Sequence, residues 1–154
     1  MIQYGVTIEG LDKLRAALKN APDQVVAETS KAVQKSVLTI ESNSKKEAPV
    51  NKSFGGGTLR QNIRSGLITR LRGYVRAEAP YSGYVEGGTR PHEIRPVVKK
   101  ALANKRTGEF FGKLVHHPGT KANPFFKRGI DASKNAIIGF FESAINTIVK
   151  NLAK

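Results

Sequence analysis

Two long stretches of the sequence repeat their apolar residues at helical spacing, and this constrains the fold more than any other feature. The second stretch starts at Asn123-Pro124, an asparagine cap followed by proline at the first helical position. Its apolar face carries Phe126, Ile130, Ile137, Phe141, Ile145, Ile148 and Leu152. This pattern predicts a long C-terminal helix that forms a main part of the core. Gly129 and Gly139 interrupt the pattern and indicate a close contact or a bend.

The first stretch begins at Pro22, which suits a first helical position, and ends before Pro49. One face carries Val26, Val33, Val37, Ile40 and Ser44, and the opposite face is polar. Because proline cannot continue a helix, the pattern predicts an amphipathic helix that Pro49 terminates.

Residues that alternate between apolar and polar predict a small sheet beside the helices. Residues 1–8 alternate in this way and are followed by a short amphipathic stretch that ends near Asn20. Residues 66–79 predict a hairpin that turns near Arg72-Gly73, and residues 110–115 predict a strand that closes against it. We therefore expect an α+β fold. A small antiparallel or mixed sheet packs against a long helix in the N-terminal half and a long C-terminal helix. We expect one domain over residues 1–154, with flexible loops near 50–57 and 99–109.

The composition excludes several classes of protein. The 154 residues contain no cysteine, which rules out disulfides, thiolate metal sites and a thiol nucleophile. No apolar run approaches the roughly 20 residues that span a bilayer, and the N-terminus lacks the apolar segment of a secretion signal. Lysine and arginine total 26 against 12 acidic residues, a net charge of 26 − 12 = +14. Such an excess favours DNA or acidic protein surfaces as partners.

Basic residues are concentrated in two segments. Residues 48–77 contain no acidic residue, and a second basic segment covers residues 99–106. We expect contacts with neighbouring subunits or with DNA in a channel from Arg60, Arg64, Arg70, Arg72, Arg76, Lys99, Lys100, Lys105 and Arg106. Tyr74 and Phe54 lie close enough in sequence to stack on bases in a nucleic-acid complex. The alternative is a solvated face, or one that meets acidic neighbours.

No set of residues has the spacing of a catalytic, cofactor or metal site. His116 and His117 are adjacent, so on a strand they point to opposite faces and are poorly placed to share a metal. Glu86 has no second carboxylate or base near it in sequence, which favours a structural role. A hydrolase that uses Glu86 with a histidine remains the enzymatic alternative. The sequence thus predicts a protein without enzymatic activity, metal or cofactor.

Two turn-rich segments frame the basic segment at 99–106, namely residues 81–92 and 116–126. The first, Tyr-Ser-Gly-Tyr-Val-Glu-Gly-Gly-Thr-Arg-Pro-His, predicts one helical turn with Tyr81, Tyr84 and Val85 inward, followed by a sharp bend at Gly87-Gly88. The second is His-His-Pro-Gly-Thr-Lys-Ala-Asn-Pro-Phe-Phe. We expect the two segments to form the frame of one functional surface.

These two segments and the order of the other elements resemble the tail-component family of long-tailed bacteriophages, which is related to neck and tail-completion proteins such as tail protein Z of phage lambda. The resemblance covers nearly the whole chain. It rests on Tyr84-Val85-Glu86-x-Gly88-Thr89, on His117-Pro118-Gly119-Thr120 and on Pro124-Phe125-Phe126. It implies architectural roles for Tyr84, Glu86, Gly88, Thr89, His117, Pro118, Gly119, Pro124 and Phe125. Gly87 departs from the family pattern, in which a bulky residue is common.

The resemblance also implies a function. It predicts a virion structural protein at the head–tail junction or in the tail, made in the host cytoplasm and assembled as a ring, with a hexamer and a dodecamer as the candidate states. The implied partners are further copies of the chain, other neck proteins such as a connector, tail terminator or tail tube, and packaged DNA. A non-specific nucleic-acid-binding protein that uses its basic loops is the alternative.

Overall fold

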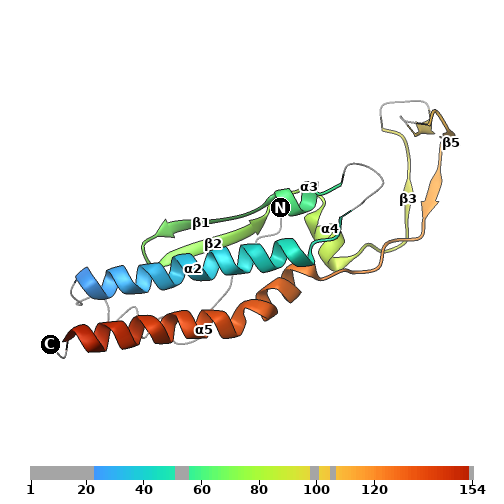
Figure 1. Ribbon diagram of the computed structural model, residues 1–154. Coiled ribbons are helices and arrows are strands. Elements are labelled where there is room, and N and C mark those ends of the chain that lie inside the picture. The colour runs from blue at the N-terminus through green and yellow to red at the C-terminus, as the bar shows by residue number, and fades with distance from the viewer. Residues whose placement is uncertain (1–22, 51–55, 98–100, 105–106, 153–154) are drawn as a thin grey trace. The chain divides into compact units, whose positions relative to one another are not determined.

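The computed structural model describes residues 23–50, 56–97, 101–104 and 107–152 (Figure 1). The chain divides into two compact units. Unit 1 holds the described residues up to Ser82 and from Phe125 onward, and unit 2 is Gly83–Pro124. The strand predicted at residues 1–8 and the helix predicted to end near Asn20 lie outside the described residues. The single-domain organisation stays a prediction.

Unit 1 has the α+β architecture that the sequence predicts. It contains the long helices α2 (Asp23–Glu47) and α5 (Phe125–Leu152), the single-turn helix α3 (Thr58–Gln61), and an antiparallel hairpin of β1 (Ile63–Thr69) and β2 (Arg72–Ala77) (Figure 1). The hairpin and α5 both pack on α2, which is therefore the central element of this unit. No helix in the described ranges has an apolar stretch sufficient to cross a membrane.

The helices α2 and α5 run antiparallel (Figure 1), and their backbones come close together at Gly129. A Cβ atom at Gly129 would lie 2.5 Å from the Cα of Ser44 and 2.6 Å from its backbone nitrogen, so a larger side chain does not fit between them. Ser133 lies one turn further along α5 and is fully buried. Its Oγ donates to the Gly129 carbonyl at 2.7 Å and accepts from Asn43 Nδ2 at 3.0 Å. Small residues thus set the helix separation, as the sequence indicated for Gly129.

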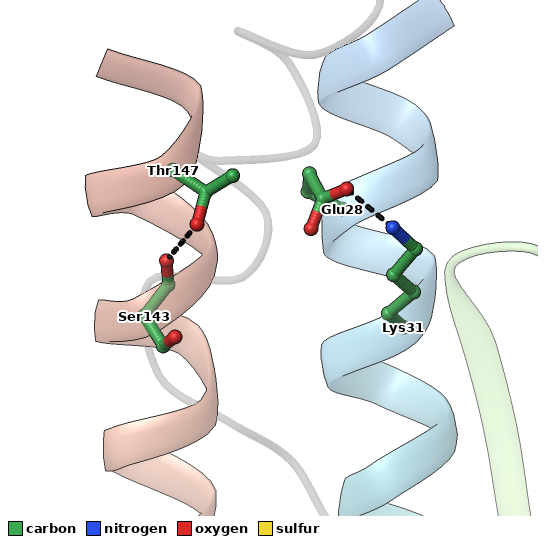
Figure 2. Close-up of polar contacts among 4 residues, drawn as sticks. All are labelled: Glu28, Lys31, Ser143 and Thr147. Carbon is green, nitrogen blue, oxygen red and sulfur yellow. Dashed lines mark hydrogen bonds and ion pairs between the residues drawn. The ribbon is translucent and has the colours of Figure 1, made fainter. Parts of the chain in front are cut away.

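Buried apolar side chains of both helices contribute to the core of unit 1. In α2 they include Val33, Val37 and Ile40, and in α5 they include Phe126, Ile137 and Ala144. The predicted apolar face of α5 is wider than the buried face, because Ile145 stays 47% exposed. Near the other end of the pair, Glu28 accepts from Lys31 within α2, and Thr147 Oγ1 donates to the Ser143 carbonyl within α5 (Figure 2). Both contacts stay within one helix, so they do not tie the two helices together.

The hairpin turns at Arg70-Leu71 rather than near Arg72-Gly73, since Thr69 pairs with Arg72. Gly73 lies inside β2, at a point where β2 passes close to α2. A Cβ atom there would come within 2.5 Å of Val37 Cγ1. The glycine therefore marks a close approach of strand and helix, which a sequence cannot distinguish from a turn signal.

A half-buried polar contact joins the hairpin to α2. The Glu41 carboxylate accepts hydrogen bonds from Lys45 in α2 and from Ser65 in β1. Burial raises the pKa of Glu41, and the hydrogen bonds from Lys45 and Ser65 lower it. Together they hold the pKa of Glu41 below its ordinary value of 4.5. The ionised carboxylate is therefore the form that the folded state prefers.

The close approach at Gly129 leads to a prediction with opposite signs at two positions of α5. Gly129→Ala would press a methyl group against the Ser44 backbone, so we expect a loss of about 2 kcal/mol or more in the free energy of unfolding. Gly139→Ala meets no atom within 4 Å. We expect that variant to gain up to about 1 kcal/mol, because alanine favours the helix more than glycine does. Urea unfolding of the two variants measures both effects, and equal values would contradict the assigned contact.

The contacts of Glu41 predict a pH-dependent effect on stability. Because its pKa is lower in the folded state than in the unfolded state, the carboxylate stabilises the fold above its ordinary value of 4.5, and this contribution is lost as the pH falls through the folded-state pKa. We expect Glu41→Gln to cost about 1–2 kcal/mol at pH 7, and the difference from wild type to shrink in acid. Urea titrations between neutral and acidic pH test this. A difference that does not change with pH would contradict it.

Candidate functional site

In unit 2, the two turn-rich segments of the sequence meet through main-chain hydrogen bonds. The amide of Thr89 donates to the Thr120 carbonyl at 3.0 Å, and the amide of Thr120 donates to the Thr89 carbonyl at 3.1 Å. Their hydroxyl groups lie 3.0 Å apart. A further bond runs from the Asn123 amide to the Val85 carbonyl at 2.9 Å. Segments 81–92 and 116–126 therefore lie against each other, as expected, and their role as the frame of a functional surface stays a prediction.

Two glycines allow this close approach. A Cβ atom at Gly88 would lie 2.5 Å from the Thr120 carbonyl oxygen, and one at Gly119 would lie 2.3 Å from the Thr89 carbonyl oxygen. Both residues also have a positive φ, 71° and 85°, which side chains strongly disfavour. The contact formed by Gly88, Thr89, Gly119 and Thr120 is called the clasp below. Gly87, by contrast, has open space around it, so a bulky residue would fit there.

The helix α4 (Ser82–Gly87) leads into the clasp, as predicted, but it buries different residues. Tyr81 and Tyr84 are exposed, whereas Ser82 and Glu86 are buried. The inward positions predicted for the two tyrosines are therefore wrong. Ser82 Oγ donates to the Ala77 carbonyl at 2.9 Å, which places this hydroxyl on the inner side of the turn.

Beyond the clasp, unit 2 continues as a two-stranded ribbon. The strand β3 (His92–Ile94) pairs with β6 (Val115–His117), and β4 (Leu102–Ala103) pairs with β5 (Phe110–Gly112), both antiparallel (Figure 1). The prediction that residues 110–115 close against the β1–β2 hairpin is wrong, since their partners are β4 and β3. Short-range pairing across the ribbon takes the place of the predicted sheet.

The histidines lie on the ribbon next to the clasp. His92 and His117 are cross-strand partners, and their rings stack with centroids 4.9 Å apart. His92 Nδ1 donates to the Arg90 carbonyl at 2.9 Å, while His117 Nδ1 accepts from the Gly119 amide at 3.0 Å. His116 lies on the opposite face, with its Nδ1 3.7 Å from Glu93 Oε1. The opposite orientation of His116 and His117 is confirmed. The described residues contain no group of three metal-ligating side chains.

Unit 2 buries almost none of its side chains. Among its described residues, Glu86 alone is buried. Large apolar side chains stay exposed, namely Val97 at 96%, Phe110 at 78%, Tyr84 at 66%, Phe111 at 48% and Leu114 at 37%. A segment of this size with no buried apolar residue and several exposed ones is typical of a surface that a partner covers. These exposed side chains, which come from α4 and from both faces of the ribbon, are together called the apolar ribbon surface and are the first candidate site.

Sequence reasoning missed Phe110 and Phe111 as site residues, since it predicts only that they belong to a strand that closes against the hairpin. Consecutive residues of a strand point to opposite faces, so a two-stranded ribbon without a layer packed on each face cannot bury both. The adjacent pair of aromatics was the available signal.

The second candidate site is the outward face of the hairpin in unit 1. Arg64 and Arg76 are direct cross-strand partners, and Arg72 lies on the same face by alternation along β2. The Arg76 guanidinium lies over the Tyr74 ring, 4.3 Å from its centroid. No ion pair joins these arginines to an acidic residue in the described part of the chain.

The remaining predicted contact residues lie elsewhere. Arg60 is on α3 and its Nη2 donates to the Ala48 carbonyl at 3.3 Å, so it ties α3 to the end of α2. Arg70 is exposed in the hairpin turn. Lys99, Lys100, Lys105 and Arg106 lie outside the described residues. Pro118 and Pro124 are exposed, and Phe125 is buried against Phe126 in unit 1, with their rings edge to face.

Comparison with protein-family models, with curated proteins and with solved structures finds no match to this chain.

The clasp predicts a local effect of substitution. In Gly119→Ala the new methyl group collides with the Thr89 carbonyl, so we expect the amides of Thr89 and Thr120 to lose their protection from hydrogen exchange. Gly87→Ala is the matched control, because it lies beside the clasp in open space. Exchange measured by NMR distinguishes the two variants. Unchanged protection in Gly119→Ala would show that the clasp does not depend on this glycine.

Proposed function

We propose that this chain is a structural protein of the neck or tail of a long-tailed bacteriophage, where it joins the head connector to the tail as one subunit of a ring. The proposal includes no enzymatic activity. The partners are further copies of the chain and adjacent neck proteins, and the protein is part of the virion.

The observation that carries the proposal is the apolar ribbon surface of unit 2. Its aromatic and aliphatic side chains have no partner layer among the described residues of the unit, and burying each against a neighbour would contribute about 1.5–3 kcal/mol. The two-stranded ribbon also has open edges that accept further strands. Such a surface suits a subunit that is completed by assembly, and the resemblance of the clasp segments to the phage tail-component family supports the same function.

The geometry favours a ring over a two-fold dimer. The ribbon surface belongs to unit 2, while the exposed apolar residues of α2 and α5, such as Leu38 and Ile138, belong to unit 1. Contact between two different patches is heterologous, and repeated heterologous contact closes into a ring when the rotation allows it. The net charge of +14 opposes self-association unless acidic groups face the basic ones across the contact.

We expect the purified chain to form a closed oligomer at micromolar concentration. Replacing Phe110 and Phe111 by serine removes apolar area that the neighbour would bury, so we expect the dissociation constant to rise at least about tenfold. Size-exclusion chromatography with light scattering measures the oligomeric state and its dependence on concentration, and negative-stain imaging shows whether the oligomer is closed. Since both side chains are exposed, the double variant should keep the thermal stability of the wild-type monomer.

Ile68→Ser, which removes an exposed apolar side chain from β1, outside both patches, tests whether the effect belongs to the ribbon. The proposal predicts a smaller rise in the dissociation constant of the oligomer for this control. A wild-type chain that stays monomeric at every concentration, and that mass spectrometry does not find in purified particles, would refute the proposed function.

A further inference from the structure

The outward face of the β1–β2 hairpin places like charges next to one another without compensation. Arg64 and Arg76 are direct cross-strand partners, an arrangement that destabilises a sheet when no anion lies nearby. No acidic residue occurs between residues 48 and 77. The Nε atom of Arg76 is buried and has no hydrogen-bond partner in the part of the chain that the structure describes.

The position of Arg76 is fixed by an aromatic ring and a glycine. The Tyr74 ring lies across the strand partner Gly66, where a Cβ atom would come within 2.8–2.9 Å of the phenol end of the ring. The Arg76 guanidinium lies over the same ring, 4.3 Å from its centroid. Gly66 therefore makes room for the ring, and the ring supports the guanidinium. This holds a rotamer-rich side chain in place before any ligand binds, which lowers the entropic cost of binding.

The same arrangement excludes the base stacking that the sequence suggested for Tyr74. One part of the ring contacts the backbone of β1 at Gly66 and a face is covered by Arg76. A nucleotide base has no free access to this ring, so the hairpin is unsuited to the stacking mode of single-strand binding. Contacts with backbone phosphates remain available to the arginines.

The spacing of the arginines indicates a ligand with repeated charges. Arg72 lies four residues from Arg76 on β2, about 13 Å along the strand, and Arg64 lies opposite Arg76. A single acidic side chain would neutralise one position, whereas a phosphodiester backbone presents a charge at regular intervals. Guanidinium groups bind phosphate through paired N–H donors.

We propose that the outward face of the hairpin, formed by Arg64, Arg72, Tyr74 and Arg76, binds the phosphate backbone of double-stranded DNA without reading its sequence. This surface belongs to unit 1, whereas the residues that carry the assembly proposal belong to unit 2, so a monomer would possess it as well. In a neck or tail ring it would be a contact with DNA passing through the channel.

The test is the affinity of the full chain for a labelled duplex of ~25 base pairs, measured by fluorescence anisotropy over a range of salt concentrations. We expect Arg64→Ala with Arg76→Ala to weaken binding about tenfold at low salt and to reduce the slope of log K against log salt by about 2. Two randomised sequences should bind equally. The matched control is Lys46→Ala with Lys134→Ala, which removes the same charge from α2 and α5.

Each outcome decides the matter. A selective loss in the arginine variant with an unchanged oligomeric state supports the proposal, whether or not the wild type forms a ring. Equal losses of DNA affinity in both double variants would mean that net charge alone causes the effect, which would overturn the proposal. Loss of assembly together with DNA affinity would assign the arginines to a subunit contact instead. Competition by polyglutamate as effective as by duplex DNA would point to an acidic protein partner, which also overturns the proposal.

Discussion

The close approach of α2 and α5 at Gly129 and Ser44 is the constraint on which the rest of unit 1 depends. With the helix backbones this near, no side chain larger than hydrogen fits at position 129, and Ser133 has its hydroxyl satisfied by Asn43 and the Gly129 carbonyl. The apolar side chains further along can then pack against one another. The hairpin lies against α2, where Gly73 allows a second close approach and Glu41 accepts from Ser65. One helix thus organises both layers through small residues and one half-buried carboxylate.

Unit 2 is built on a different principle. Its described residues bury a single side chain, and main-chain hydrogen bonds between Thr89 and Thr120 hold the clasp. Pairing of this kind specifies geometry but contributes little stability in water, since the same groups bond to solvent when the chain unfolds. A ribbon that exposes Phe110 and Val97 lacks the apolar burial that normally stabilises a small sheet. This contrast between the two units is the physical basis for proposing an assembled protein.

The two candidate surfaces have different chemistry. The ribbon surface is apolar, so in the proposed ring it would be stabilised by a neighbour that excludes water from it. The arginine face of the hairpin is cationic and depends on an anion to relieve the repulsion between Arg64 and Arg76. A protein that holds neighbours through one surface and DNA through another matches both the exposed aromatics and the net charge of +14. The first interaction should tolerate salt, whereas the second should weaken with it.

The sequence alone determined the two long helices, the α+β class and the importance of the glycines near residues 88 and 119, because periodicity and proline or glycine punctuation act locally. It also indicated the basic hairpin, since the absence of acids from residues 48–77 is a property of composition. Only the tertiary structure decided that Gly73 marks a close approach and not a turn, that Tyr74 supports Arg76, and that Phe110 and Phe111 are exposed. These outcomes depend on which strand pairs with which and on what lies across from each side chain. Contacts between residues far apart in the chain set both, and spacing along the chain does not encode them.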